Sequence, residues 1–416
     1  MKSQIKQFYT YSKEERHQRL AEHIDHPAIV EKLTQSVDDE VLDHLVENYM
    51  APFELPLGIA TNFIVNEQDI FIPMVTEEPS VIAAASHAAK LARYYDGFKA
   101  QVLQRSMTGE VILEHISDVN VAKQALLEQK DRLLQQLNEL RPSMVKRGGG
   151  ATEMEVVTFD DLNTVTVYFF IDTKDAMGAN MINSLMEQIA PTLETITQGH
   201  TLLAILSNYA TETLTTASCL IPYDAMGPQG KEVATRIKQA TDYAYHDVYR
   251  AVTHNKGIMN GIEAVTTAIG NDTRALSACI HAYASRHGQY QPLTRYELKE
   301  EGLYGEITLP LPVGIVGGAT KILPLAQFSL QLMDVKTAEQ LMEIMASVGL
   351  AQNIAALKAL VTEGIQKGHM NLQAKSLAMQ VGAHGEEIEH VAKFLRSQST
   401  MTEQAAKDYL ASLRQS

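Results

Sequence analysis

Two adjacent glutamates, Glu77 and Glu78, stand directly before a run of small apolar residues. Pro79 suits the first turn of a helix, because its missing N–H would have no partner there. The residues Val81–Ala89 are apolar on nearly every face, a pattern typical of a helix that is covered on all sides. The segment therefore predicts carboxylates carried into the interior, where an acid needs a chemical partner. The alternative is that both glutamates complement the helix dipole at a wet rim.

A second segment of interest lies far along the chain, in the polar stretch Val248–Ile262 between apolar helical runs. Arg250 offers a planar fork suited to a carboxylate, and Lys256 offers a compact charge suited to an oxyanion. Asp272 follows the apolar run Ala264–Ile269, so we expect it at the end of an element near Lys256. The stretch itself is either a loop or a site.

Three further segments could bind an anion or move a proton. Asp175–Asn180 opens an expected helix whose first N–H groups would face a phosphate, although Asp175 could simply be the N-cap. The triple glycine at 148–150 is more typical of a turn than of a phosphate cradle, and no Gly-x-Gly-x-x-Gly fingerprint is present. His369 lies beside glycines at 364 and 368, which predict a hinge.

Composition limits the possible partners. The 416 residues include 35 Lys and Arg against 50 Asp and Glu, a net charge of −15 that disfavours nucleic acid and anionic membranes as partners. Two cysteines, Cys219 and Cys279, fit a reducing compartment and offer neither a disulfide framework nor a zinc cluster, so no metal is expected. The start of the chain lacks an apolar signal region, and no uninterrupted apolar run approaches about 18 residues. We therefore expect a soluble cytoplasmic protein.

A compact series of elements between residues 106 and 214 alternates as β-α-β-β-α-β, the order of a ferredoxin-like unit. Its expected members are the strand Glu110–Ile116, the helix Val121–Leu140, the strands Glu155–Phe159 and Thr164–Ile171, a helix from Gly178 to Thr197, and the strand Leu202–Leu206. The chain is thus expected to be α+β, with this small domain inserted into a larger mixed domain.

The larger domain is expected to comprise residues 1–105 and 215–368, built around the buried helix after Glu78. Its first 50 residues predict polar amphipathic helices that pack as an arm, and short extended runs before Glu78 predict a hairpin. Residues 369–416 are expected to form a mobile helical flap, in which 386–416 predict two amphipathic helices.

Taken together, these segments resemble 3-hydroxy-3-methylglutaryl-CoA (HMG-CoA) reductase of the soluble bacterial and archaeal class, class II. The resemblance extends over nearly the whole chain and is carried, in order, by Pro73–Ser86, Asp175–Asn180, Ile205–Asn208, Thr253–Gly261, Gly270–Asp272, Val316–Lys321 and Gly349–Asn353. It implies a catalytic set of Glu78, Lys256, Asp272 and His369. It also implies substrate-binding roles for Ser80, Arg250 and Asn260, and cofactor-binding roles for Asp118, Asp175, Met177, Gly178, Asn180 and Asn208.

The implied reaction is the reversible four-electron reduction of HMG-CoA to mevalonate and CoA by two nicotinamide hydrides. Lys256 would stabilise the oxyanion, Glu78 would donate a proton, and His369 would protonate the CoA thiolate. A helix N-terminus and Lys256 both favour an ionised Glu78, so burial beside Asp272 must oppose them, and we expect these three side chains to share hydrogen bonds.

The resemblance also bears on cofactor and assembly. Asp118 falls where the family selects its cofactor, and an acid there favours NADH over NADPH because it would repel a 2′-phosphate. Family members form dimers with sites at the subunit interface and serve the mevalonate route to isoprenoids. The rival functions are reduction of another acyl-CoA, hydrolysis or lysis of a CoA thioester without nicotinamide, and ligand sensing without catalysis.

Overall fold

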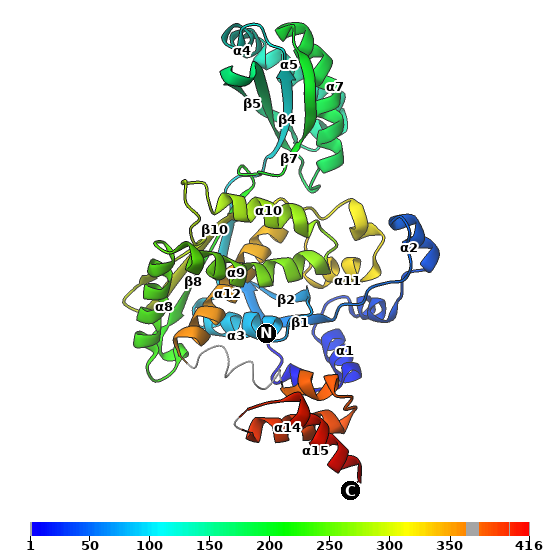
Figure 1. Cartoon of the computed structure of the whole chain (residues 1–416), viewed down its shortest axis with the longest axis vertical. Coiled ribbons are helices and arrows are strands. Elements are labelled where there is room, and N and C mark those ends of the chain that lie inside the picture. The colour runs from blue at the N-terminus through cyan, green and yellow to red at the C-terminus, as the bar shows by residue number, and fades with distance from the viewer. Residues whose placement is uncertain (1, 363–373, 399, 416) are drawn as a thin grey trace.

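The computed structural model describes residues 2–362, 374–398 and 400–415. Its centre is a six-stranded sheet in the order β2-β1-β3-β8-β10-β9, and a four-stranded sheet in the order β5-β6-β4-β7 stands apart at one end of the molecule (Figure 1). The chain leaves the large sheet after β3 and returns to it in β8, the neighbouring strand. The predicted mixed α+β fold is confirmed.

The large sheet begins with the predicted hairpin of β1 and β2. Asn66 and Glu67 form its two-residue turn with φ of 47° and 69°, and such left-handed pairs match the twist of antiparallel strands. This hairpin leads into the segment that carries Glu78. The strands are β1 (Leu57–Val65), β2 (Gln68–Val75), β3 (Phe98–Val102), β8 (Leu214–Pro222), β9 (Thr294–Leu298) and β10 (Gly302–Pro310).

The small unit has the predicted β-α-β-β-α-β order, and all of its strand pairs are antiparallel. The single helix expected over 121–140 is two helices, because the chain leaves helical geometry at Gln129. The unit packs its own core, which includes Val111, Leu133, Phe169 and Met186. Its elements are β4 (Met107–Glu114), α4 (Val119–Glu128), α5 (Lys130–Leu140), α6 (Pro142–Lys146), β5 (Gly150–Phe159), β6 (Thr164–Asp172), α7 (Ala179–Thr197) and β7 (His200–Ser207).

Three helices of the large unit pack together, namely α3 (Val81–Ala92), α9 (Val248–Ala268) and α12 (Ala338–Val361). The prediction that α3 is covered on all sides is wrong, since Ala83, His87 and Lys90 are exposed along one face. The thoroughly buried helix is α12, which a capping box of Thr337 and Gln340 starts. By length and composition α12 could cross a membrane, but 78% of its most apolar window is buried inside the protein, as in a core helix.

The remaining helices of the large unit lie around this core. The polar stretch 248–262, expected as a loop or a site, is the first part of the 21-residue helix α9. The other helices are α8 (Gly230–Ala244), α10 (Thr273–Tyr283) and α11 (Pro324–Leu332).

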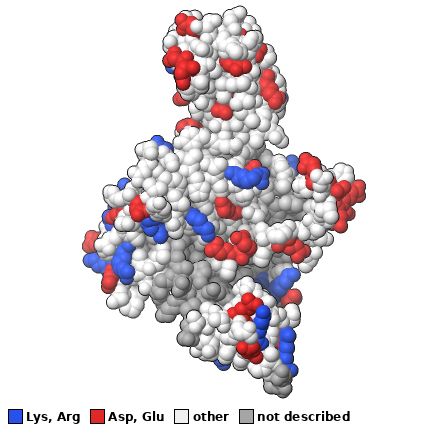
Figure 2. Space-filling view, in the orientation of Figure 1, with Lys and Arg blue, Asp and Glu red and all other residues white. Residues whose placement is uncertain are grey.

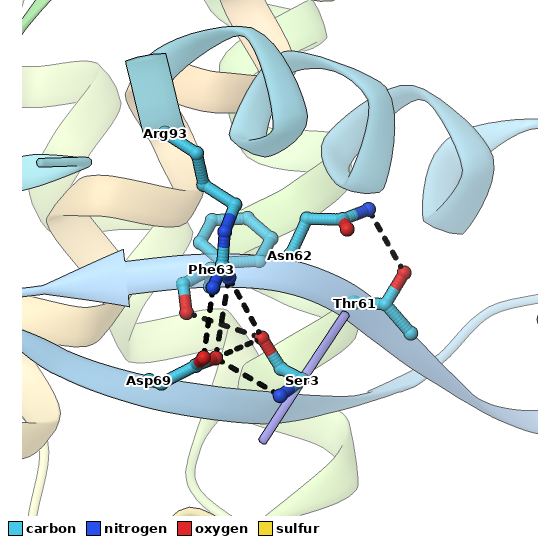
Figure 3. A network of polar contacts seen from close by, with 6 residues as sticks. All are labelled: Ser3, Thr61, Asn62, Phe63, Asp69 and Arg93. Atoms are coloured by element: carbon cyan, nitrogen blue, oxygen red, sulfur yellow. Dashed lines mark hydrogen bonds and ion pairs between the residues drawn. The ribbon is translucent and has the colours of Figure 1, made fainter. Parts of the chain in front are cut away.

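The N-terminal arm is fastened to the hairpin by a polar network (Figure 3). Ser3 is fully buried, donates its backbone N–H to Asp69 Oδ1 at 3.0 Å, and accepts from Asn62 N through its carbonyl at 3.0 Å. Arg93 at the end of α3 clamps Asp69 with two bonds of 3.2 and 2.8 Å. The arm then continues through α1 (Lys13–Glu22) and α2 (Asp39–Leu45), and Leu20 packs with Phe71 of β2.

The C-terminal helices α14 (Glu386–Ser397) and α15 (Glu403–Gln415) are the two amphipathic helices that the sequence predicts. Phe394 and Tyr409 stack with ring centroids 4.1 Å apart, and Arg414 bridges to Glu387. These helices have a separate small core at the end of the molecule opposite the small sheet (Figure 1).

Candidate active site

Glu78 and Lys256 form an ion pair at the heart of the predicted catalytic set. Glu78 lies in the turn between β2 and α3, and its Oε2 accepts a hydrogen bond from Lys256 Nζ at 3.0 Å. The side chains are 37% and 60% exposed, respectively, so the expectation of a fully buried acid is wrong. The reason is that Glu78 precedes α3 on a turn instead of entering the covered face of that helix.

The turn that presents Glu78 is conformationally unusual. The helix begins only at Val81, so Pro79 precedes the cap and does not occupy the first turn as expected. Ser80 is the N-cap and adopts φ 78° and ψ −19°, a left-handed conformation that is uncommon for a residue with a side chain. Glu78 N–H donates to Thr76 Oγ1 at 3.1 Å, which ties the turn to the end of β2.

Asp272 caps α10 at its N-terminus, in agreement with its expected place at the end of an element. Its Oδ1 accepts from the backbone N–H groups of Arg274 and Ala275 at 2.9 and 3.1 Å, and its Oδ2 pairs with Arg274 Nη2 at 3.2 Å. Of the hydrogen bonds expected among Glu78, Lys256 and Asp272, the structure has the one between Glu78 and Lys256. The Asp272 carboxylate is instead held by the amides of α10.

Two hollows meet at the ion pair. A hollow of about 420 Å³ is lined by Glu77, Asn260, Glu263 and Arg274, among others, and a groove of about 550 Å³ runs between α3, α9 and α12. Glu78, Lys256 and Asn260 line both. Lys256 and Asn260 are four residues apart on α9 and so share one helix face. A substrate in either hollow could therefore reach the pair.

Ser80 and Arg250, the other predicted substrate residues, line the groove. Arg250 is half-buried, and burial lowers the pKa of its guanidinium, an effect that Asp247 partly offsets. Its Nε is buried and has no hydrogen-bond partner among the described residues. Arg250 thus places a cation with one unsatisfied N–H group at the groove.

A buried polar network lies beneath the groove and was not predicted from the sequence. Thr294 Oγ1 donates its only hydrogen to Asn353 Oδ1 at 3.0 Å, and Tyr296 OH donates to the same oxygen at 2.7 Å. His254 Nε2, at 2.6 Å from Thr294 Oγ1, must therefore carry the ring hydrogen, which leaves Nδ1 as an acceptor. Nδ1 is buried without a partner among the described residues.

Burial, together with the charge of Arg250 one turn earlier, lowers the pKa of His254 to about 3. His254 is therefore neutral at physiological pH, and its network fixes the helix face next to Lys256. The signal in the sequence was a set of polar side chains, His254, Asn255, Gln352 and Asn353, within helices that are otherwise apolar.

The predicted cofactor residues lie in the small unit. Gly178 is the N-cap of α7 with φ 94°, and a Cβ there would lie 2.5 Å from Thr173 Cγ2, so the position requires glycine. Met177 packs against the small core, and Asn180 is exposed in the first turn of α7. Asp118 caps α4, and Asn208 is exposed just after β7.

Asp175 does not cap the helix that follows it. Its Oδ1 accepts from Ala338 N, the first amide of α12, at 2.9 Å. Gly149 in the triple glycine approaches Asp172 O so closely that a Cβ there would lie at 2.5 Å, which favours the interpretation as a packed turn. His369 lies outside the described residues.

The chain is similar to known proteins along most of its length. The family model for hydroxymethylglutaryl-coenzyme A reductase matches residues 12–374. A 3-hydroxy-3-methylglutaryl-coenzyme A reductase of Archaeoglobus fulgidus is 43% identical over 419 residues, which span 100% of this chain and 95% of that protein. A probable reductase of Borreliella burgdorferi is 34% identical, over 82% of this chain and 79% of that one.

Solved structures of the same enzyme from Streptococcus pneumoniae share the fold. One matches with a TM-score of 0.83 and 43% identity, over 98% of this chain and 99% of that one. A second, described as class II and bound to NADPH in open conformations, matches with a TM-score of 0.82 and 44% identity, over 97% of this chain and 100% of that one. The chain therefore belongs to the 3-hydroxy-3-methylglutaryl-CoA reductase family of NAD(P)H-dependent oxidoreductases, as its motifs predict.

Proposed function

We propose that this chain catalyses the reversible reduction of HMG-CoA to mevalonate and CoA. Two NAD(P)H and two protons are consumed for each CoA released, since a thioester becomes an aldehyde and then an alcohol. The observation that carries the proposal is the Glu78–Lys256 pair, which stands between two hollows in a chain of this family.

Lys256 has the role of stabilising the oxygen that becomes negative when hydride adds to the carbonyl carbon. An ammonium group does this far more strongly in a dry site than in water. Lys256 is 60% exposed in the single chain, so substrate and the covering parts of the assembly would have to exclude the water.

Glu78 has the role of the proton donor in the aldehyde step. It already bonds to Lys256, so a proton on Glu78 and the charge of Lys256 would reach the same developing alkoxide. Asp272 has a supporting role from the start of α10, next to the hollow that Arg274 lines. His369, which would protonate the CoA thiolate, lies outside the described residues.

Arg250 has the role of binding the terminal carboxylate of the substrate. Its unpartnered Nε and its place in the groove support that role. Ser80 and Asn260 line the same groove and would bind the remaining polar groups of the hydroxymethylglutaryl moiety.

The residues of the small unit fit a nicotinamide dinucleotide, which supplies the hydride when bound. The N-cap of α7 is a glycine, so no side chain bonds to the first amides of this 19-residue helix. These amides can therefore donate hydrogen bonds to phosphate oxygens. Gly178 also allows close approach of a ligand to the backbone. Asn180 and Asn208 are exposed and could donate side-chain amides.

Two observations bear on the choice between NADH and NADPH. The acidity of Asp118 favours NADH, whereas a relative 44% identical to this chain is described as bound to NADPH. Figure 2 shows scattered acidic side chains and few basic ones on the visible face of the small unit. This distribution offers little attraction to an additional phosphate.

We propose the domain boundaries and assembly on the same basis. Residues 106–214 would form the cofactor domain, 1–105 and 215–368 the substrate domain, and 369–416 the flap. A cytoplasmic homodimer with sites at the subunit interface would cover Tyr249, which is 90% exposed beside Arg250.

The decisive test follows NADH and NADPH oxidation with HMG-CoA and counts CoA released. Two nicotinamides per CoA support the proposal, whereas CoA release without nicotinamide oxidation would indicate a hydrolase or lyase. Lys256→Ala should lower kcat by roughly 10²-fold or more. Lys299→Ala, which removes an exposed lysine paired with Glu297, is the control and should be unchanged. Near-normal turnover of Lys256→Ala would contradict the mechanism.

A further inference from the structure

The small unit is joined to the large unit by a narrow neck of two antiparallel segments. The outgoing segment, 103–106, pairs with the returning segment: Leu103 N donates to Leu214 O at 2.8 Å, and Ser106 N donates to Glu212 O at 2.7 Å. Thr213 Oγ1 donates to Ser106 O at 2.7 Å and closes the neck. Figure 1 shows how little chain connects the two units.

Arg105 lies in this neck, and its guanidinium binds backbone carbonyls of two other segments. Nε donates to Lys174 O at 2.8 Å, and Nη2 donates to Ala176 O at 3.1 Å and to Val313 O at 3.2 Å, with a further short contact to Lys174 O. Among the described residues, Arg105 forms no ion pair. Its burial lowers the pKa, and Asp172 and Asp175 partly compensate.

The carbonyls that Arg105 holds belong to both units. Lys174 and Ala176 flank Asp175 in the loop 173–178, which leads to the glycine cap of α7. Val313 belongs to the large unit, where its neighbour Gly314 exchanges two 2.9 Å hydrogen bonds with the side chain of Asn271, the residue before Asp272. Arg105 thus connects the loop of the proposed cofactor site to the segment that supports the proposed acid–base residues.

Other contacts press the same loop against the large unit. Ile315 N donates to Asp175 O at 2.8 Å, and Asp175 Oδ1 accepts from Ala338 N at the start of α12. A Cβ on Gly314 would lie 2.4 Å from Met177 N, so the two backbones touch. These contacts fix the position of the loop 173–178 against the large unit, and Arg105 binds the loop from the side of the neck.

We propose that Arg105 is a positioning residue for the nicotinamide cofactor: its fork of donors holds the loop 173–178 at a fixed place relative to the acid–base residues of the large unit. The inference rests on the proposed function. Only arginine presents several N–H groups in one plane, so lysine would keep the charge and lose the three-carbonyl grip.

The test compares Arg105→Lys with the wild type, and uses Gln104→Ala, an exposed neighbour in the same segment, as the matched control. Arg105→Lys should weaken NADPH binding, measured by fluorescence titration, about tenfold, while the KM for HMG-CoA changes by less than about twofold. Amide exchange at Ile315 and Ala338 should accelerate, with the centre of α12 unaffected. Gln104→Ala should match the wild type in each measurement.

Circular dichroism and gel filtration establish that the variants fold, and Arg105→Gln replaces Arg105→Lys if the lysine variant does not. Unchanged NADPH affinity, or equal losses for NADPH and HMG-CoA, would overturn the inference. The failure of the proposed function looks different: the wild type would bind NADPH without oxidising it on addition of HMG-CoA, and the loss of NADPH affinity in Arg105→Lys would still support the role of Arg105.

Discussion

His254 should make this protein lose stability on mild acidification. Its pKa is lowered from 6.5 to about 3 by burial and by Arg250, so the folded protein keeps the ring neutral at pH 5 while the unfolded chain protonates it. A depressed pKa leaves stability intact above pH 6.5 and removes it progressively as the pH falls toward 3. Linkage gives a loss of about 2 kcal/mol between pH 7 and pH 5.

The variant His254→Gln isolates this contribution. A glutamine amide can donate to Thr294 Oγ1, as His254 Nε2 does at 2.6 Å, but it does not titrate. The free energy of unfolding is measured by urea titration, followed by circular dichroism, at pH 7 and at pH 5 for both proteins. The loss between the two pH values should be smaller in the variant by about 2 kcal/mol.

The comparison removes the other histidines and any packing cost of the substitution, because both enter each pair of measurements equally. Equal losses in the two proteins, within about 0.5 kcal/mol, would show that the folded protein protonates His254 as readily as the unfolded chain does. That result would refute the argument that burial and the charge of Arg250 keep the His254 ring neutral in the folded protein.

Three further predictions follow from single side chains. Asp69→Asn should weaken the attachment of the N-terminal arm. Burial raises the pKa of Asp69, but the hydrogen bonds from Arg93 and Ser3 outweigh burial and lower the pKa overall, so the stability that these bonds supply is present above about pH 4 and lost below it. Limited proteolysis near Ser3 at pH 7 should show faster cleavage of the variant, and unchanged cleavage would contradict the prediction. Gly178→Ala should destabilise the protein by about 1 kcal/mol or more and weaken NADPH binding, because φ is 94° and Thr173 blocks the Cβ; melting and titration measure both. Asp118→Ala should lose a cap worth about 1 kcal/mol and shift the ratio of kcat/KM values toward NADPH, and an unchanged ratio would remove Asp118 from cofactor selection.

The sequence predicted what depends on local patterns. Alternating apolar residues and short turns located the strands of the small unit and the hairpin at Asn66. The polar stretch after Val248 was harder to assign, because polar side chains in a helix resemble a loop until their burial is known. The structure explains them, since His254 Nε2 and the Asn255 side chain form hydrogen bonds with groups 40 and 36 residues away, respectively.

Contacts between distant segments could not be derived from such patterns. The Glu78–Lys256 bond joins residues 178 positions apart, and only the resemblance to a family suggested it. Asp175 was considered as the cap of its own helix but reaches a helix 163 residues away, because Gly178 already starts α7. The exposure of α3 was misjudged because alanine is compatible with either side of a helix, although Lys90 marked the exposed side.

Glu78, Asp272 and Asp175 differ in how their carboxylates are held, and this difference bears on their proposed roles. Asp272 and Asp175 accept hydrogen bonds from backbone amides at helix starts, contacts that fix the position of a carboxylate. The Glu78 carboxylate is instead held by the side-chain ammonium group of Lys256, in a turn that precedes α3. A proton donor gives its proton to the substrate and is then reprotonated, so its hydrogen-bond partner changes during the reaction, whereas a carboxylate that caps a helix cannot change partner without disturbing that helix. This difference supports the proposal that Glu78 transfers the proton, while the two aspartates hold the elements around it.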